Sequence, residues 1–345
     1  MFQINDRKIG ENYPPYIIAE MSNNHLKDLN RAYELVYAAK KSGVDALKIQ
    51  TYTPDSLTID CDSKDFVIED ALWKGKTYYE LYNEIAMPLS WNKLLFEKAR
   101  EVGITIFSSP FDEDSVDLLE DLNSPAYKIA SFESKDPYFL KKVVSTHKPI
   151  ILSTGVSSLN EIMETVTTAK DMGCKSLAVL HCISSYPAET KEMNLNVIKE
   201  LKKMGVVVGL SDHSLSNLAA VLSVGLGASI IEKHYTISRS DGGPDAEFSL
   251  EPEELALLKS ESYKAWEALG SGKILSETKR VGSRNSRSIY FVKDMKVGDM
   301  ITTDCIRRIR PGYGLAPKYE GRLIGKKVSQ DVKRGTATSW GLINE

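Results

Sequence analysis

The chain has 345 residues, of which 42% are hydrophobic and 26% are charged, and its formal net charge is -3. This length supports one large domain and a small one, and the mixed charge gives no basic face for a nucleic acid. No apolar run approaches the roughly 18 residues of a membrane span, and the N-terminal segment lacks the apolar core of a signal peptide. The cysteines are scattered without a CxxC pair, as is usual in a reducing compartment: Cys61, Cys174, Cys182 and Cys305. We therefore expect a cytoplasmic protein that acts on small molecules, without a membrane or nucleic acid partner.

The first elements along the chain are a predicted hairpin and a predicted barrel. The opening segment FQINDRKIG has apolar residues alternating around NDRK, which predicts a β-hairpin that closes one end of a barrel. Eight β-rich runs then alternate with segments of helical spacing over residues 16–270: YIIAEMS, ALKIQTY, ITIFSSP, AYKIAS, PIILSTG, SLAVLHCIS, VVVGLSDHS and ASIIEKHYT. Apolar strands that alternate with helices predict an α/β protein with a (β/α)8 TIM barrel. A doubly wound open sheet is the alternative, but no GxGxxG motif follows the first run.

A long aromatic segment follows the second run. It begins at TPDSL and ends at EIAMPL, which makes it far longer than an ordinary loop between a strand and a helix. Such a loop leaves the carboxyl end of its strand, the catalytic side of a barrel, so it is predicted to cover a substrate. A packed surface excursion is the alternative interpretation.

The pattern changes after the last helical segment. Residues 273–285 are rich in glycine, serine and charge, and residues 286–345 contain short β-type runs broken by VGDM, RPGYG and KRGT. We therefore predict a barrel domain with its hairpin over residues 1–272, a linker over 273–285 and a small β-rich domain over 286–345. About 60 residues is near the lower limit for independent folding, so this domain is expected to lean on a barrel, its own or a partner's.

The carboxyl ends of the predicted strands are polar, and in a (β/α)8 barrel these ends form the active site. Lys48 and Lys128 lie within apolar runs, where an unpaired charge is costly and a bound anion would offset the cost. Serines at neighbouring strand ends would add donors for phosphate or carboxylate oxygens: Ser131, Ser153 and Ser211. Each serine alone is as readily a turn or cap residue, so their convergence with the lysines is what predicts an anion site.

Two histidines follow the last two strands, in GLSDHS and EKHYT. Because these strands are neighbours in a closed barrel, the imidazoles of His213 and His234 are expected to converge. Two neutral imidazoles with open positions suit Mn²⁺, Co²⁺ or Zn²⁺, and Glu20 or Glu232 would add a carboxylate. For any single histidine, a hydrogen-bonded structural role is the alternative.

The ordered set YIIAEMSNNH, LKIQTY, YKIASFES, ILSTGVS, LHCISSYPA, GLSDHS, IIEKHYT and GPDAEFSLEP resembles the nonulosonate (sialic acid) synthase family. The closing module with RPGYGL resembles the antifreeze-like (SAF) domain of that family. The resemblance implies a phosphoenolpyruvate-dependent aldol-type synthase, which is a transferase that forms a C–C bond. Such an enzyme condenses phosphoenolpyruvate with an open-chain N-acetylated amino sugar, releases phosphate and forms a nine-carbon α-keto acid.

The resemblance also implies roles for individual residues. His213 and His234 would bind a divalent metal, with Mn²⁺ favoured and Co²⁺ or Mg²⁺ as alternatives. The residues implied to bind phosphoenolpyruvate are Lys48, Lys128, Ser131, Ser153 and Ser211. The residues implied to bind the sugar or complete the catalytic set are Glu20, Gln50, Glu133, Ser184, Tyr186 and Asp245.

The small domain gains a role from the same resemblance. In this family it covers the barrel mouth of the partner in a domain-swapped homodimer, and one of its arginines reaches the acylamino group of the sugar. Arg310 in IRPGYGL matches that arginine. Without the family pattern, Arg310 would be interpreted as a surface residue beside a turn.

Two sequence features bear on the sugar. CISSYPA has Ser184 where N-acetylneuraminate synthases tend to have asparagine, and LWKGKTYYELY is closer to the pseudaminic acid synthases. That subfamily uses 2,4-diacetamido-2,4,6-trideoxy-L-altrose, a less polar sugar that an aromatic lid would suit. N-acetylneuraminate or legionaminate synthesis is the alternative within the family. Outside it, the alternatives are a keto-sugar phosphate synthase, a metal aldolase, or a non-enzymatic sugar- or ice-binding protein.

Overall fold

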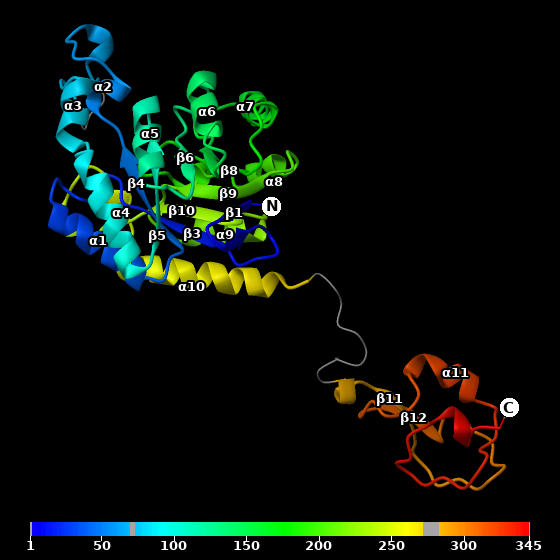
Figure 1. The fold of residues 1–345 in the computed structure, drawn as a ribbon. Helices are drawn as coiled ribbons and strands as arrows, with labels where there is room; N and C mark the ends of the chain where they lie inside the picture. Colours follow the sequence, from blue (N-terminus) through cyan, green and yellow to red (C-terminus); the bar gives the residue numbers. More distant parts are fainter. Residues whose placement is uncertain (1, 70–72, 272–282, 345) are drawn as a thin grey trace. The chain divides into compact units, whose positions relative to one another are not determined.

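The computed structural model describes residues 2–69, 73–271 and 283–344 (Figure 1). The chain divides into two compact units, Met1–Gly270 and Ser271–Glu345, and each is described here by itself. Residues 273–282 of the predicted linker lie outside the described residues, and a single 3-10 turn, Ser283–Asn285, follows them. Among the described residues, none of the helices combines the length and the apolarity that crossing a membrane requires.

The first unit contains the eight-stranded parallel barrel that the sequence predicts. Its strands are β3 (Tyr16–Glu20), β4 (Ala46–Thr51), β5 (Thr105–Pro110), β6 (Tyr127–Ile129), β7 (Ile150–Ser153), β8 (Leu177–Cys182), β9 (Val207–Asp212) and β10 (Ile230–His234). They follow one another in chain order around the barrel, and β10 pairs with β3 to close it. This closure excludes the open-sheet alternative.

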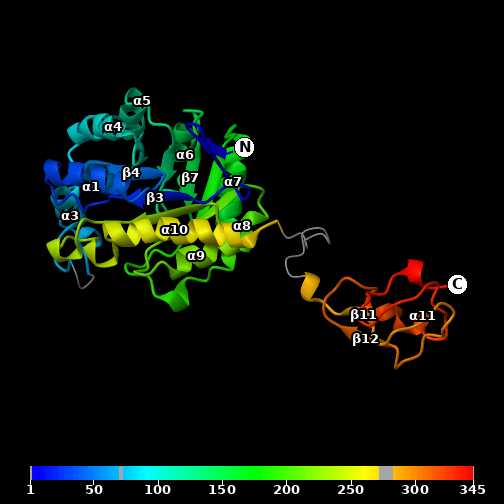
Figure 2. The ribbon, with the colours of Figure 1, turned by 90° about the horizontal axis from the view of Figure 1, so that it is seen from below.

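Helices cover the outside of the barrel (Figures 1 and 2). They are α1 (Leu29–Lys41), α4 (Ser90–Val102), α5 (Glu113–Asp121), α6 (Pro137–Val144), α7 (Leu159–Asp171), α8 (Val197–Lys202), α9 (Leu218–Gly225) and α10 (Pro252–Leu269). The long α10 packs against both α1 and α9.

Local sequence determines where several of these helices begin or end. Asp28 caps α1 by accepting from two backbone amides, Ser158 and Glu161 form a capping box on α7, and Gly103 ends α4 at φ 72°.

The predicted hairpin is present and closes the amino end of the barrel. β1 (Phe2–Ile4) pairs antiparallel with β2 (Arg7–Ile9). Phe2, Ile4 and Ile9 are buried in one cluster with the residues that point into the barrel at its amino end, such as Tyr16 and Phe107. The amino half of the barrel is therefore filled and dry, which leaves only the carboxyl end open for chemistry.

The long segment after β4 also has structure of its own. It contains the short helix α2 (Pro54–Leu57), a 3-10 turn at Lys64–Phe66 and α3 (Tyr78–Ile85), while residues 70–72 lie outside the described part. Capping boxes begin α2 at Thr53 and α3 at Thr77. The segment leaves the carboxyl end of β4, as expected of a loop that borders the site.

The second unit is small and β-rich, as expected. β11 (Ser288–Phe291) pairs antiparallel with β12 (Ile306–Ile309), and a short helix α11 (Glu320–Leu323) follows. Its own core holds Ile289, Phe291, Ile301, Leu323 and Val328, all buried. This architecture is compatible with the antifreeze-like module that the sequence resembles.

The hairpin provides a first test of the fold. Replacing buried Ile4 with alanine should lower the free energy of unfolding by about 2 to 5 kcal/mol, because the apolar cluster loses contacts and gains a cavity. Urea denaturation followed by far-UV circular dichroism measures this change. Lys8→Ala, at an exposed position of the same hairpin, is the matched control. If Ile4→Ala is as stable as Lys8→Ala, the hairpin does not close the barrel.

Candidate active site

Alternation along the strands decides which side chains enter the barrel. On β3, Tyr16 and Ile18 belong to the apolar interior cluster, so Glu20 on the same face also points inward. The same alternation points Lys48, Lys128, Ser211 and Glu232 into the carboxyl half of the barrel. All of these polar side chains are buried. The interior therefore changes from an apolar layer to a charged one along the barrel axis.

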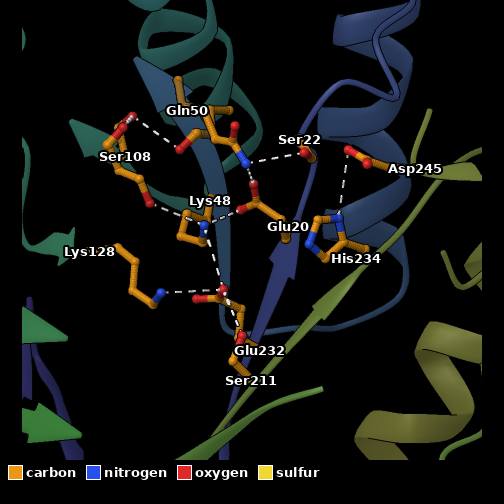
Figure 3. Close-up of polar contacts among 12 residues, drawn as sticks. Glu20, Ser22, Lys48, Gln50, Ser108, Lys128, Ser211, Glu232, His234 and Asp245 are labelled. Carbon is orange, nitrogen blue, oxygen red and sulfur yellow. Dashed lines mark hydrogen bonds and ion pairs between the residues drawn. The ribbon is translucent and has the colours of Figure 1, made fainter. Parts of the chain in front are cut away.

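Lys48 is the centre of this charged layer (Figure 3). Its Nζ lies 2.6 Å from Oε2 of Glu20 and 3.5 Å from Oε1 of Glu232. Glu232 Oε1 also lies 3.7 Å from Nζ of Lys128 and accepts a hydrogen bond from Ser211 at 3.3 Å. Gln50 donates to Glu20 at 2.9 Å and so fixes the second oxygen of that carboxylate. Two lysines and two glutamates thus form one buried chain of charges.

The two lysines differ in their surroundings. Burial would lower the pKa of Lys48, but the carboxylates of Glu20 and Glu232 outweigh burial and raise it. Burial lowers the pKa of Lys128, because Glu232 offsets only part of the cost and Lys48 adds repulsion. Lys128 is therefore the cation with the most to gain from a bound anion.

The sequence predicts that a bound anion offsets the charges of both Lys48 and Lys128. The structure modifies this expectation. Glu20 from β3 and Glu232 from β10 already neutralise Lys48, because the closed barrel brings the first and last strands beside β4. The demand for an external anion therefore falls mainly on Lys128.

Three serines line the same region, on β9, on β7 and just beyond β6. Ser153 Oγ is buried without a hydrogen-bond partner among the described residues, so it is free to donate to a ligand. Ser131 Oγ accepts a hydrogen bond from the backbone amide of Gly155 at 2.9 Å. A Cβ atom on Gly155 would lie only 2.1 Å from Ser184 Oγ and 3.0 Å from Ser131 Oγ. Glycine at this position therefore lets the backbone approach the serine hydroxyls.

His213 and His234 lie side by side at the carboxyl ends of β9 and β10. Their ring centroids are 5.3 Å apart. Nδ1 of His213 is 2.9 Å from the carbonyl oxygen of Ile183, and since a carbonyl can only accept, Nδ1 carries the proton. In the neutral imidazole, Nε2 is then the nitrogen that can bind a ligand. Nδ1 of His234 is buried without a hydrogen-bond partner in the described part of the chain and lies 4.0 Å from Oδ2 of Asp245. Burial holds the pKa of His234 well below its ordinary value, so its imidazole is neutral.

These groups fit a divalent cation. Neutral imidazoles bind borderline divalent ions, and a buried ring nitrogen without a partner is costly unless something occupies it. Within the described residues, no group of three or more histidine, cysteine, aspartate or glutamate side chains is arranged to hold a metal. A cation at the histidine pair would therefore depend on substrate or water oxygens for its other ligands.

Asp245 lies near His234 and, through Asn23, near a wall of aromatic rings formed by Tyr52, Phe111 and Tyr82. Asn23 donates to its Oδ2 through both the backbone amide and the side chain, each at 3.3 Å. Tyr52 is buried with its hydroxyl 3.5 Å from Asn23 Oδ1, and burial, with Asp245 adding to it, raises the pKa of that hydroxyl. The ring of Tyr52 packs edge-on against Phe111 at 5.3 Å and against Tyr82 at 6.2 Å.

Glu133 lies near the other end of this wall. Burial raises its pKa, and its Oε2 has no hydrogen-bond partner among the described residues. Burial also raises the pKa of the Tyr82 hydroxyl, with smaller contributions from Tyr78 and Glu133. The aromatic rings of Tyr52 and Tyr82 thus extend from the Asp245 region toward Glu133.

The barrel brings together most of the residues singled out in the sequence. The ring of Tyr186 is tilted by 39° against the ring of His213, with the centroids 4.3 Å apart, which places Tyr186 beside the histidine pair. Arg310 belongs to the second unit, where it lines a pocket of about 590 Å³ with Arg287, Arg307, Arg308 and Ile309. His181 is a structural histidine, because its Nε2 bonds the carbonyl oxygen of Met193 at 2.7 Å.

Three further side chains contribute to the site, although the sequence analysis assigned none of them a role. Ser109 accepts from Lys48 at 3.2 Å, Asn23 holds Asp245, and Phe248 packs 5.0 Å from the His234 ring. Ser109 and Asn23 lie at the polar ends of predicted strands, and alternation along FSSP, with Phe107 and Ser109 on one face, indicates that Ser109 points inward. No periodicity indicates where Asn23 or Phe248 points, because both lie in irregular segments.

Comparison with known proteins decides the family, because residues 35–274 match the NeuB family. The chain belongs to the NeuB family. A pseudaminic acid synthase from Campylobacter jejuni is 42% identical over 328 residues, which cover 94% of this chain and 96% of that protein. An N,N'-diacetyllegionaminic acid synthase from Legionella pneumophila is 36% identical and covers 96% of this chain and 95% of its own length.

A solved structure agrees with this family. The N-acetylneuraminic acid (sialic acid) synthetase from Leptospira borgpetersenii, in complex with citrate, is 33% identical with a TM-score of 0.72. The match covers 80% of this chain and 92% of that one. The resemblance to sialic acid synthases that the motifs predicted is thereby confirmed.

The charged layer of this NeuB-family barrel can be tested through Glu232. Glu232→Gln removes the carboxylate between two buried lysines and should lower the free energy of unfolding by about 3 to 5 kcal/mol. Urea denaturation measures the change. Glu84→Gln, which alters an exposed ion pair with Lys76, should leave the urea midpoint unchanged. Equal stability of the two variants would mean that Glu232 does not neutralise the lysines.

Proposed function

We propose that this chain is a phosphoenolpyruvate-dependent synthase that makes pseudaminic acid. The reaction condenses phosphoenolpyruvate with 2,4-diacetamido-2,4,6-trideoxy-L-altrose to give a nine-carbon α-keto acid and inorganic phosphate. The observation that carries the proposal is the meeting, at one barrel mouth, of a partly compensated lysine, serine donors and a histidine pair. Membership of the NeuB family supports the same reaction.

Phosphoenolpyruvate carries a phosphate and a carboxylate, and the charged layer suits both. Lys128 has the least compensated charge of the layer, and Ser153 Oγ has no hydrogen-bond partner within the described part of the chain, so these two side chains are proposed to receive one anionic group. Ser131, Ser211 and Lys48 are proposed to complete the site. Because Glu20 and Glu232 already neutralise Lys48, the attraction for the anionic ligand comes mainly from Lys128.

In the proposed reaction, the enol carbon of phosphoenolpyruvate attacks the aldehyde carbon of the open-chain sugar and a C–C bond forms. Water adds to the cation that results, and phosphate leaves with cleavage of its C–O bond. A divalent cation on His213 and His234, with Mn²⁺ preferred over Co²⁺ or Mg²⁺, would supply Lewis-acid polarisation of the aldehyde. The lysines hold the anionic groups in place throughout and stabilise their charge.

The wall of aromatic rings supports the assignment of the sugar. A 2,4-diacetamido-2,4,6-trideoxy hexose presents methyl groups where a fully hydroxylated sugar presents oxygens. Tyr52, Phe111 and Tyr82 offer an apolar surface to such methyl groups, and Glu133 with Asp245 offers acceptors for the remaining hydroxyl and amide hydrogens. Tyr186, Ser184 and Gln50 are also proposed to contact the sugar.

The proposal extends to the second unit and to the cellular compartment. We infer a domain-swapped homodimer in which the antifreeze-like unit of one subunit covers the barrel of the other and Arg310 contacts the acylamino group. Within the described residues, Arg310 forms no ion pair with a carboxylate, which supports a role in binding. The four free cysteines are consistent with a cytoplasmic enzyme.

A direct assay tests the reaction. The protein loaded with Mn²⁺ is incubated with phosphoenolpyruvate and, separately, with the trideoxy altrose derivative, its legionaminate counterpart and N-acetylmannosamine. We expect stoichiometric phosphate release and a keto acid of the pseudaminic acid mass with the first sugar. No phosphate release with any sugar would remove the synthase proposal, and turnover with N-acetylmannosamine alone would remove the pseudaminic one.

The histidine pair gives a separate test. His213→Ala and His234→Ala should each abolish metal-dependent turnover and calorimetric Mn²⁺ binding, while the circular dichroism spectrum stays unchanged. His147→Asn, at an exposed histidine with φ 58°, is the control, because asparagine tolerates that backbone conformation. Retention of Mn²⁺ binding by either alanine variant would contradict the ligand assignment.

A further inference from the structure

A buried ion pair lies directly beside the two histidines. Asp212 precedes His213 at the end of β9, and Lys233 precedes His234 on β10. Nζ of Lys233 is 2.8 Å from Oδ2 of Asp212. Both side chains are inaccessible, with 1% of Asp212 and 0% of Lys233 exposed. The sequence reasoning gave this pair no role, and the proposed reaction does not use it.

The pair lies on the outer face of the barrel, away from the reaction. Glu232 and His234 point inward, so Lys233 between them points toward the helices. Ile231, two residues earlier on β10, belongs to the apolar cluster between the barrel and the helices, which agrees with this direction. Neither Asp212 nor Lys233 therefore reaches a substrate inside the barrel.

Lys233 also binds the loop that follows His213. Its Nζ donates to the carbonyl oxygen of Ser214 and, at 3.0 Å, to the carbonyl oxygen of Ser216. Asp212 Oδ1 accepts from the backbone amide of Ser214 at 2.8 Å. Lys233, which is the residue before His234, therefore contacts the chain on both sides of His213.

Stability alone does not account for these contacts. Removing two charges from water is costly, and well-packed apolar side chains of similar size would often stabilise a fold as much or more. Strand pairing already aligns Lys233 with Asp212 in the parallel ladder between β9 and β10. What the ion pair adds is a fixed path for the loop that begins at His213, where the regular strand has ended.

We propose that Asp212 and Lys233 are positioning residues that hold the imidazoles of His213 and His234 at the separation a divalent cation requires. The binding of a metal by these histidines rests on the proposed function, but the positioning of the two imidazoles by the ion pair does not. Without the ion pair, the loop of residues 213–216 loses the Lys233 contacts to its carbonyl oxygens, and fewer contacts hold His213 beside His234.

The test uses variants of the full-length protein. Asp212→Asn and Lys233→Met each leave one buried charge unpaired, so either single variant is at risk of failing to fold. The double variant Asp212→Asn/Lys233→Met carries neither charge, so it leaves no buried charge unpaired and its metal binding can be measured. The matched control is Asp45→Asn/Lys259→Met, which removes an ion pair at the amino end of β4.

Calorimetric titration with Mn²⁺ alone is the first readout. We expect the double variant to keep its circular dichroism spectrum and to bind Mn²⁺ about 10- to 100-fold more weakly, as loss of supporting contacts to a metal ligand typically does. The control should bind Mn²⁺ like the wild type. At saturating Mn²⁺, the KM for phosphoenolpyruvate should be unchanged, because Lys128 and Ser153, the side chains proposed to receive an anionic group, lie on β6 and β7. Wild-type Mn²⁺ affinity in the double variant would overturn the proposal.

A crystal structure of the metal-free double variant is the second readout, and it does not depend on the function. The imidazole centroids are 5.3 Å apart in the native chain. We expect displaced or multiple positions for the His213 ring in the double variant. An unchanged ring pair would refute the positioning role. If the wild type itself binds no Mn²⁺, the proposed metal chemistry fails, and this structure still decides whether the ion pair positions the histidines.

Discussion

The ion pair between Lys48 and Glu20, which Glu232 extends to Lys128, is the interaction on which the carboxyl half of the barrel depends. These side chains are buried in the barrel, so each charge needs a partner inside it. Closure supplies the partners, because β10 and β3 bring Glu232 and Glu20 next to β4. The cluster can therefore be charged and stable before any ligand binds. Lys128 is the least compensated member and gives the site its affinity for an anion.

The apolar half of the barrel makes this charged half possible. The hairpin of β1 and β2 closes the amino end with a layer of buried apolar side chains below the charges. In such a buried environment, the fixed lysine and serine donors act with little screening on a bound phosphate or carboxylate. The histidine pair lies at the open end of the same interior, where a sugar aldehyde would arrive. The outer ion pair of Asp212 and Lys233 supports that end from behind the strands.

The sequence predicted the barrel well, because each strand is an apolar run between helical segments and a regular alternation of this kind fits few folds besides a closed barrel. It also predicted the neighbouring histidines, since strand order in a closed barrel follows chain order. The charge pairing was harder to foresee. Lys48 and Glu20 lie on different strands, and whether they meet depends on register and on strand closure, neither of which a local pattern encodes. No role could be assigned to Asn23 or Phe248 from the sequence, because irregular segments have no periodicity to indicate where a side chain points.

Calorimetric titration of phosphoenolpyruvate into the protein, without sugar, tests the central claim about the charged layer most directly. Lys128→Met removes the least compensated cation, and binding should weaken about 10- to 100-fold, the value of a charge-assisted hydrogen bond. Lys135→Met, at a lysine that pairs with Glu161 outside the barrel, should bind phosphoenolpyruvate like the wild type. Unchanged binding in Lys128→Met would contradict the account, because the buried lysine would then have no part in holding the anion.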